Sequence, residues 1–145
     1  MIRYRSMERE DCQAVEALFE ECFSHPWKRE AIEETFSAEG YVSLVAETDH
    51  RIVGYIGYRS VLDEADITNV AVSPDLRRRG IGHQLLEKLL HIAGNEGISA
   101  IYLEVRVSNI AAITLYEHAG FRLCGQRKNY YTEPEEDALL MCFTN

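Results

Sequence analysis

Apolar residues recur along the chain with two different periods, and these periods predict the order of its elements. A spacing of three or four residues, typical of a helix with one buried face, predicts helices over residues 8–23, 28–36, 80–94 and from Ser108 or Asn109 to 119. Alternation and short apolar runs predict strands over residues 2–5, 41–47, 51–60, 65–72, 99–107, from 121 onward, and 138–143. The predicted order is β-α-α-β-β-β-α-β-α-β-β, an α/β chain with a mixed sheet.

The strand predicted at 99–107 carries a carboxylate among apolar residues. Its apolar side chains, Ile101, Leu103, Val105 and Val107, face one way. Glu104 faces the other way, together with Tyr102 and Arg106. Two structural interpretations of Glu104 remain open at this point, a solvated side chain and an ion pair with Arg106.

Length, composition and charge limit the kinds of protein that this chain can be. With 145 residues, 46% hydrophobic and 27% charged, the chain is expected to form one domain over residues 1–145. It has no apolar run of about 20 residues and no apolar leader, so we expect a cytoplasmic protein without a membrane partner. The net charge of −9 argues against a nucleic-acid partner and suits a basic one.

The cysteines carry no motif of their own. Cys12, Cys22, Cys124 and Cys142 form no C-x-x-C pair and have no histidine at metal-ligand spacing. We therefore expect small buried thiols and no metal.

A basic, glycine-bearing segment follows the strand predicted at 65–72 and opens the helix predicted at 80–94. It reads Arg77-Arg78-Arg79-Gly80-Ile81-Gly82. Free N–H groups at a helix N-terminus bind anions, glycines allow close approach, and arginines add charge and donors. The residues after Gly82 match neither the P-loop nor the dinucleotide fingerprint. The segment predicts a site for a phosphate-bearing cofactor, with a solvated basic helix cap as the alternative.

Three motifs together resemble the GCN5-related N-acetyltransferases (GNAT) from end to end. They are Asn69-Val70-Ala71-Val72-Ser73-Pro74, Arg77-x-x-Gly80-x-Gly82, and Asn109 followed by Leu115-Tyr116-x-x-x-Gly120-Phe121. The resemblance implies the single-domain GNAT fold, with splayed central strands, and acetyl-CoA as cosubstrate.

Within that family the chain looks most like the RimI type, which acetylates the N-terminal alanine of a ribosomal protein. The resemblance rests on the residues from Leu103 to Glu117, His25-Pro26-Trp27, Asn129-Tyr130-Tyr131 and Glu136-Asp137-Ala138. The implied reaction is acetyl transfer to a protein N-terminal α-amine, most closely that of a small-subunit ribosomal protein. Transfer to a small amine or a lysine, or a non-catalytic CoA-binding module, are the alternatives.

The resemblance also implies cofactor-binding residues: Val70, Ala71, Val72, Arg77, Arg78, Arg79, Gly80, Ile81, Gly82, His83 and Asn109. The pyrophosphate would sit on the N–H groups from Arg78 to His83, and Asn109, otherwise a plain helix cap, would bind the pantetheine arm. A bulge in the strand predicted at 65–72 would leave a free N–H at Val70 or Ala71, which would polarise the thioester carbonyl.

Glu104 and Tyr116 are the catalytic residues that the resemblance implies. An α-amine has a pKa of about 8 and must lose a proton before it attacks, which is the general-base role of Glu104. Tyr116 would protonate the leaving thiolate as general acid. From ordinary pKa values of about 10 for a phenol and 8.5 for a thiol, that transfer is uphill by about 2 kcal/mol. Packing in the core is the structural alternative for Tyr116.

The expected acceptor groove is lined by Trp27, Tyr130 and Tyr131. Trp27 next to Pro26 could equally fill the core. Neighbouring residues of a regular strand point to opposite sides, so at most one of the two tyrosines should face the groove.

Overall fold

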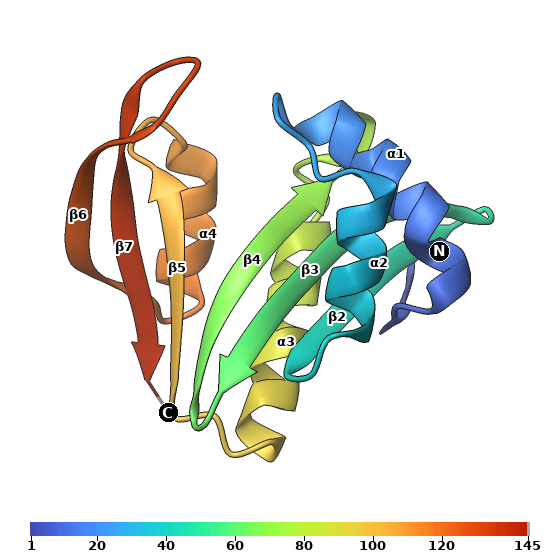
Figure 1. Ribbon diagram of the computed structural model, residues 1–145, viewed down its shortest axis with the longest axis horizontal. Helices are drawn as coiled ribbons and strands as arrows, with labels where there is room; N and C mark the ends of the chain where they lie inside the picture. Colours follow the sequence, from blue (N-terminus) through green and yellow to red (C-terminus); the bar gives the residue numbers. More distant parts are fainter. Residues whose placement is uncertain (145) are drawn as a thin grey trace.

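The protein is built on one seven-stranded sheet with helices on both faces, as the computed structural model of residues 1–144 shows (Figure 1). The elements in chain order are β1 (Arg3–Ser6), a 3-10 turn (Arg9–Asp11), α1 (Cys12–Cys22), α2 (Arg29–Ser37), β2 (Tyr41–Thr48), β3 (Arg51–Val61), β4 (Glu64–Val72), a 3-10 turn (Pro74–Leu76), α3 (Ile81–Asn95), β5 (Ala100–Arg106), α4 (Ile110–His118), β6 (Arg122–Tyr131) and β7 (Glu136–Thr144). This is the predicted order, and each strand and helix after the first helix begins and ends within two residues of its prediction. The helix predicted at 8–23 is instead a 3-10 turn followed by the shorter α1.

The strand order is β1-β2-β3-β4-β5-β7-β6, antiparallel except where α3 crosses over from β4 to a parallel β5. The β4–β5 ladder pairs only Glu64–Asp66 with Ala100–Tyr102. Beyond these residues the two strands diverge, and Figure 1 shows β4 and β5 opening away from each other toward their C-terminal ends. The splayed centre that the resemblance implied is confirmed.

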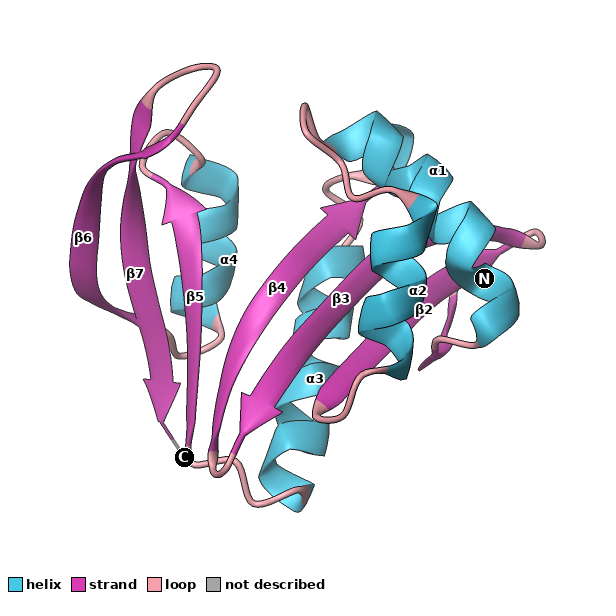
Figure 2. Cartoon of the chain, in the orientation of Figure 1, coloured by secondary structure: helices cyan, strands magenta, loops and turns pink. Residues whose placement is uncertain are grey.

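Two apolar cores cover the two faces of the sheet. Helices α1 and α2 pack on one face, where Val15, Leu18, Phe19 and Ile32 are buried. Helices α3 and α4 cover the other face, and α3 buries the stripe Ile81, Leu85, Leu86, Leu89 and Ala93. Figure 2 shows this division, with α1 and α2 in front of the sheet and α3 and α4 behind it. None of the helices in residues 1–144 has the length and apolarity needed to cross a membrane.

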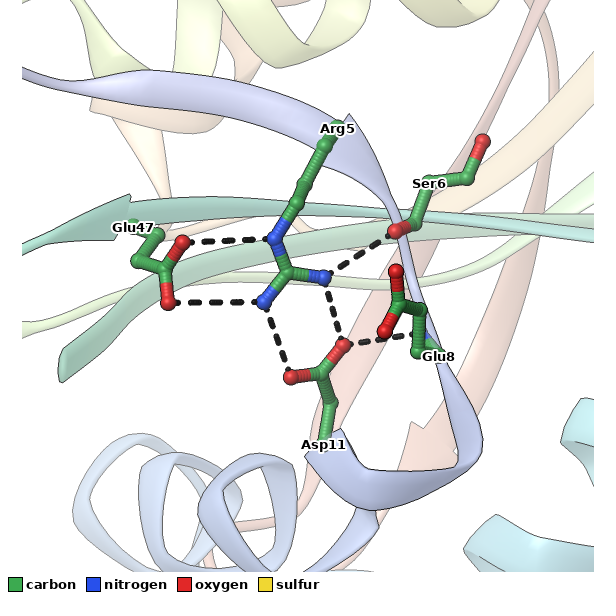
Figure 3. A network of polar contacts seen from close by, with 5 residues as sticks. All are labelled: Arg5, Ser6, Glu8, Asp11 and Glu47. Atoms are coloured by element: carbon green, nitrogen blue, oxygen red, sulfur yellow. Dashed lines mark hydrogen bonds and ion pairs between the residues drawn. The ribbon is translucent and has the colours of Figure 1, made fainter. Parts of the chain in front are cut away.

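A closed polar network joins β1, the first 3-10 turn and β2 (Figure 3). Arg5 donates from Nη1 to Asp11 Oδ2 at 2.7 Å and from Nε to Glu47 Oε1 at 3.3 Å. Asp11 also accepts the backbone N–H of Glu8 at 2.7 Å. The hydrogen bonds from Arg5 hold the pKa of Asp11 below its usual range. Every charged group in this network therefore has a partner.

Candidate active site

A bulge shapes β4 where it leaves β5. Gly57 pairs with Asn69, but the next residue of β3, Tyr58, pairs with Ile67, so Thr68 is the extra residue. The Thr68 hydroxyl donates to the Gly57 carbonyl at 3.3 Å. A bulge bends its strand and increases the local twist. The predicted bulge is therefore present, and it lies where β4 turns away from β5.

The ladder with β3 decides which backbone groups of β4 remain free. Ser73 N–H donates to the Val53 carbonyl at 2.8 Å, so this is a hydrogen-bonded pair of the antiparallel ladder. Such pairs recur every second residue, so Ala71 also directs its N–H and C=O toward β3. Val70 and Val72 must direct theirs toward the split. Of the two residues that the sequence left open, Val70 is the one with its N–H on the open edge.

A cavity of about 610 Å³ lies in the split between β4 and β5. Its walls come from the α1–α2 connection, β4, β5, α4 and the C-terminal end of β6. The lining residues are Cys22, Phe23, Ser24, His25, Trp27, Thr68, Asn69, Val70, Glu104, Val105, Arg106, Asn109, Ala112, Leu115, Tyr116, Tyr130, Tyr131 and Thr132. The cavity thus brings together Val70, Asn109, both predicted catalytic residues and all three predicted acceptor-groove residues.

Glu104 enters the cavity from the face covered by α1 and α2. Its neighbours Leu103 and Val105 are buried in the core under α3 and α4, so Glu104 points to the opposite face. The side chain is 33% exposed, and its nearest cation, Arg127 Nε, lies 3.9 Å from Oε2. At that distance the pair is loose, and the carboxylate remains available to a ligand.

The ion pair considered between Arg106 and Glu104 does not form. Arg106 Nη1 instead lies 3.1 Å from Glu136 Oε1 on the neighbouring strand β7. Glu136 also accepts the backbone N–H of Ser108 at 2.7 Å, which anchors it away from Glu104. Arg106 also donates to the backbone carbonyls of Pro134 at 2.9 Å and Thr132 at 3.1 Å, so the β6–β7 turn holds its guanidinium away from Glu104.

Tyr116 enters the cavity from α4, on the opposite face of the sheet from Glu104. It is only 6% exposed, and its hydroxyl has no hydrogen-bond partner within residues 1–144. Burial raises the pKa of Tyr116 to about 12. Against an ordinary thiol, proton transfer is then uphill by about 5 kcal/mol rather than 2, although the same burial would raise the pKa of a thiol there. The phenol is a permanently protonated donor at neutral pH.

Both tyrosines of β6 line the cavity, so the expectation that only one could is wrong. The reason is local: Asn129 has a φ of 52°, and the β6–β7 register shifts between Arg127 and Tyr131. This irregularity breaks the strict alternation of side chains. The two rings meet edge to face with centroids 5.0 Å apart. The nearby carboxylate of Glu104 raises the pKa of the Tyr130 hydroxyl.

The α1–α2 connection and the β6–β7 turn meet at the cavity. His25 Nε2 lies 3.2 Å from Glu133 Oε2, across the split sheet. Trp27 lines the cavity and also packs edge to face on Phe19, with ring centroids 6.2 Å apart. Trp27 therefore both contacts the core and forms part of the cavity wall.

The predicted phosphate site lies at the N-terminus of α3. Gly80, with a φ of 81°, is the N-cap, and its carbonyl accepts the first helical bond, from Gln84 N–H. The N–H groups of Ile81, Gly82 and His83 therefore have no acceptor within the helix, and Gly80 has no side chain to cap them. An ideal Cβ on Gly82 would lie 3.4 Å from Leu115, which lines the cavity. The helix N-terminus and the cavity are therefore adjacent.

The three arginines before this helix differ in their roles. Arg77 Nε donates to the Val72 carbonyl at 3.1 Å, one of the groups that the ladder with β3 leaves free. Arg78 and Arg79 make no ion pair within the described residues, and Arg78 has a φ of 66°. Arg78 and Arg79 are therefore the free cations of this segment.

Asn109 is the N-cap of α4, and its Oδ1 accepts the Ala112 N–H at 3.2 Å. Capping uses only the oxygen of the carboxamide. The Nδ2 donors remain for a ligand, so the two interpretations of Asn109, helix cap and ligand contact, are compatible.

Several lining residues were not among the predicted site residues, including Cys22, Thr68 and Asn69. Cys22 Sγ contacts the Val72 carbonyl at 3.4 Å. Asn69 could have been recognised as a polar residue directly before the apolar run 70–72. The bulge at Thr68 has no comparable signal in the sequence.

Comparisons with known proteins agree with this geometry. Residues 12–121 match the model of the acetyltransferase (GNAT) family. The ribosomal protein bS18-alanine N-acetyltransferase of Salmonella typhimurium is 39% identical over 136 residues, which cover 90% of this chain and 89% of that protein. The Escherichia coli protein of the same name is 37% identical over 141 residues, covering 94% and 93%. A crystal structure of the ribosomal-protein-S18-alanine N-acetyltransferase from Escherichia coli superposes with a TM-score of 0.92 at 34% identity, covering 99% of this chain and 94% of that one.

Proposed function

The chain belongs to the GNAT family of acetyltransferases, and we propose that it transfers an acetyl group from acetyl-CoA to the N-terminal alanine of ribosomal protein bS18. The observation that carries the proposal is the split between β4 and β5, whose cavity holds a carboxylate from one face of the sheet and a phenol from the other. The activity named for the relatives supports the acceptor. The enzyme would act as one domain over residues 1–145, in the cytoplasm.

The N-terminus of α3 and the open edge of β4 fit acetyl-CoA. The free N–H groups of Ile81, Gly82 and His83 would hold the pyrophosphate, with charge from Arg78 and Arg79. The pantetheine arm carries amides that can pair with the free backbone groups of Val70 and with the N–H of Val72, as an added strand does. Asn109 Nδ2 would donate to the same arm. Acetyl-CoA supplies the activated acetyl group.

Glu104 and Tyr116 line the cavity from opposite faces of the sheet, which supports the roles of base for Glu104 and acid for Tyr116. Glu104 would take a proton from the acceptor ammonium, whose pKa of about 8 leaves it mostly charged at pH 7. Val70 N–H would stabilise negative charge developing on the thioester oxygen. Tyr116 would donate its proton, or a hydrogen bond, to the departing sulfur.

The acceptor side of the cavity is acidic and aromatic. Glu104 lies near Asp66, and burial together with the charge of Glu104 raises the pKa of Asp66. Trp27, Tyr130 and Tyr131 surround the carboxylate with apolar surface. A cationic, peptide-like acceptor suits this combination, and the net charge of −9 would attract a basic ribosomal protein.

The test uses acetyl-CoA and two basic peptides, followed by mass spectrometry. One peptide begins with a free alanine, and the other has a blocked N-terminus and internal lysines. Acetylation of only the first is the expected result. Modification of the blocked peptide would make the protein a lysine acetyltransferase. Reaction of neither peptide would contradict the proposal and favour a small-amine acetyltransferase or a CoA-binding module.

A further inference from the structure

Asn69 holds an unsatisfied buried donor at the wall of the cavity. Its Nδ2 has no hydrogen-bond partner, and among such side-chain nitrogens and oxygens in residues 1–144 it is the only one fully shielded from solvent. A buried donor without an acceptor has given up its hydrogen bonds to water, so nearly all such groups in folded proteins are paired with protein or water. This unpaired amide therefore lowers the stability of the free protein, so its presence is not explained by folding.

The position of Asn69 on β4 places it on the same face of the sheet as Glu104. Asn69 lies two residues from Ala71, with no register shift between them, and Ala71 is buried under α1. Glu104 points to that face from β5, across the split. The α1–α2 connection, with Trp27, covers the same face. Asn69 thus lies on the acceptor side of the cavity, whereas Tyr116 and the N-terminus of α3 lie on the donor side.

We propose that Asn69 is a positioning residue that recognises the acceptor as a peptide, by donating from Nδ2 to the carbonyl oxygen of the acceptor's first residue. This inference rests on the proposed function. In an N-terminal residue the α-amine and the first carbonyl are separated by a single carbon atom. A donor on the same side of the cavity as Glu104 can therefore hold the carbonyl while the amine faces the carboxylate. The terminal torsion of asparagine is soft, so the carboxamide can turn Nδ2 toward an arriving oxygen.

This contact explains selection for an α-amine over other amines. A lysine side chain has no carbonyl next to its amine, and a simple alkylamine has none at all. Neither can satisfy Asn69 when its nitrogen reaches Glu104. A site that leaves its own buried polar group unpaired discriminates strongly against such substrates.

The first test replaces Asn69 with leucine, which has a similar shape and no donor. Because an unsatisfied amide is removed, Asn69→Leu should melt at the same temperature as wild type or higher. Its kcat/KM for an alanine-initiated peptide should fall tenfold or more, since a lost hydrogen bond of about 1.4 kcal/mol is a factor of ten. The KM for acetyl-CoA should not change. The matched control is Asn95→Leu at the exposed end of α3, which should leave both kinetics and melting temperature unchanged.

The second test identifies the hydrogen-bond acceptor. The first peptide carbonyl is replaced by a thiocarbonyl, a weaker acceptor, and wild type and Asn69→Leu are compared on both peptides as a double-mutant cycle. Wild type should lose severalfold in kcat/KM on the thioamide, and Asn69→Leu should lose little more than it has already lost.

Three results would overturn the inference while leaving the proposed function intact: a wild-type kcat/KM in Asn69→Leu, a large fall in its melting temperature, or equal thioamide penalties in the two proteins. Equal penalties would mean that the Asn69 carboxamide donates to a bound water or to another part of the acceptor. Absence of α-amine acetylation by wild type would instead refute the proposed function, and the inference with it.

Discussion

The polar network at Arg5 and the polar groups of the cavity differ in how far their members are paired. Asp11 and Glu47 both reach Arg5 within 3.3 Å, and the network closes on itself (Figure 3). In the cavity, Glu104 has only a cation 3.9 Å away, and neither Tyr116 nor the Asn69 amide has a hydrogen-bond partner among the described residues. Polar groups that pair with each other, as in the network, stabilise the folded chain. Buried polar groups without a partner, as in the cavity, lower its stability and are explained here by the binding of a substrate. Cavity substitutions should therefore change rates, and network substitutions should change stability.

The largest effect is expected for Glu104→Gln. Loss of the proposed base should lower kcat/KM for an alanine-initiated peptide by about 10²–10⁴-fold at pH 7, with little change in melting temperature. Because the free α-amine deprotonates near pH 8, the deficit should shrink as the pH rises above 8. The control is Glu117→Gln, an exposed residue of α4. Equal rates in Glu104→Gln and wild type at pH 7 would remove Glu104 from the mechanism.

Tyr116→Phe should lower kcat by about 10²-fold, the lower end of the range for a general acid. Burial raises the pKa of Tyr116 to about 12, so the phenol stays protonated up to pH 10 and its ionisation should cause no loss of rate below that pH. The buried Tyr58, outside the cavity, serves as the control through Tyr58→Phe. A pH–rate profile that falls between pH 8 and 10 in wild type but not in Tyr116→Phe would contradict the raised pKa.

Replacing Arg78 and Arg79 together with alanine should weaken donor binding and leave the acceptor side unchanged. Loss of two exposed cations near a pyrophosphate should raise the KM for acetyl-CoA about tenfold and flatten its dependence on salt, with kcat nearly constant. Steady-state kinetics at two ionic strengths measure both effects. Arg3→Ala, an exposed arginine on β1, is the matched control. An unchanged KM in the double variant would place the phosphates elsewhere.

The smallest effect on rate is expected for Asp11→Asn, which weakens the network. Its unfolding free energy should fall by about 1–2 kcal/mol, because Arg5 loses a charged partner that is only 11% exposed. The pKa of Asp11 is lowered in the folded protein, so its contribution is complete above the unfolded value of about 3.9 and is lost as the pH falls through the lower folded value. Denaturant unfolding at pH 7 and pH 3 measures this, with peptide acetylation at pH 7 expected to match wild type. A stability difference that grows at low pH would reverse the sign of the argument.

The order and bounds of the helices and strands could be predicted because they depend on the spacing of apolar residues within each segment. The apolar stripe of α3 and the alternation of β5 are visible in the residues themselves, and the buried side chains of Ile101, Leu103 and Val105 lie as that alternation requires. The proposed anion site is also a local feature, since Gly80 at a positive φ and the start of α3 adjoin in sequence. These features need no knowledge of distant segments.

The remaining features depend on contacts between distant segments. The free N–H of Val70 follows from its register against β3, and the partner of Arg106 is Glu136, from a strand 30 residues away in sequence. Both β6 tyrosines reach the cavity because Asn129 adopts a left-handed conformation that no local pattern announces. Asn69 could be noticed as a polar residue, but its lack of a partner is visible only after the chain has folded.

The most direct test of the central claim is the rate and site of acetylation of a peptide with the N-terminal sequence of ribosomal protein bS18, measured by mass spectrometry for wild type and Glu104→Gln at pH 7. We predict that wild type adds one acetyl group to the α-amine of the first alanine, and that Glu104→Gln does so at least 100-fold more slowly at an unchanged melting temperature. Acetylation of a lysine side chain, or equal rates for the two proteins, would contradict the account.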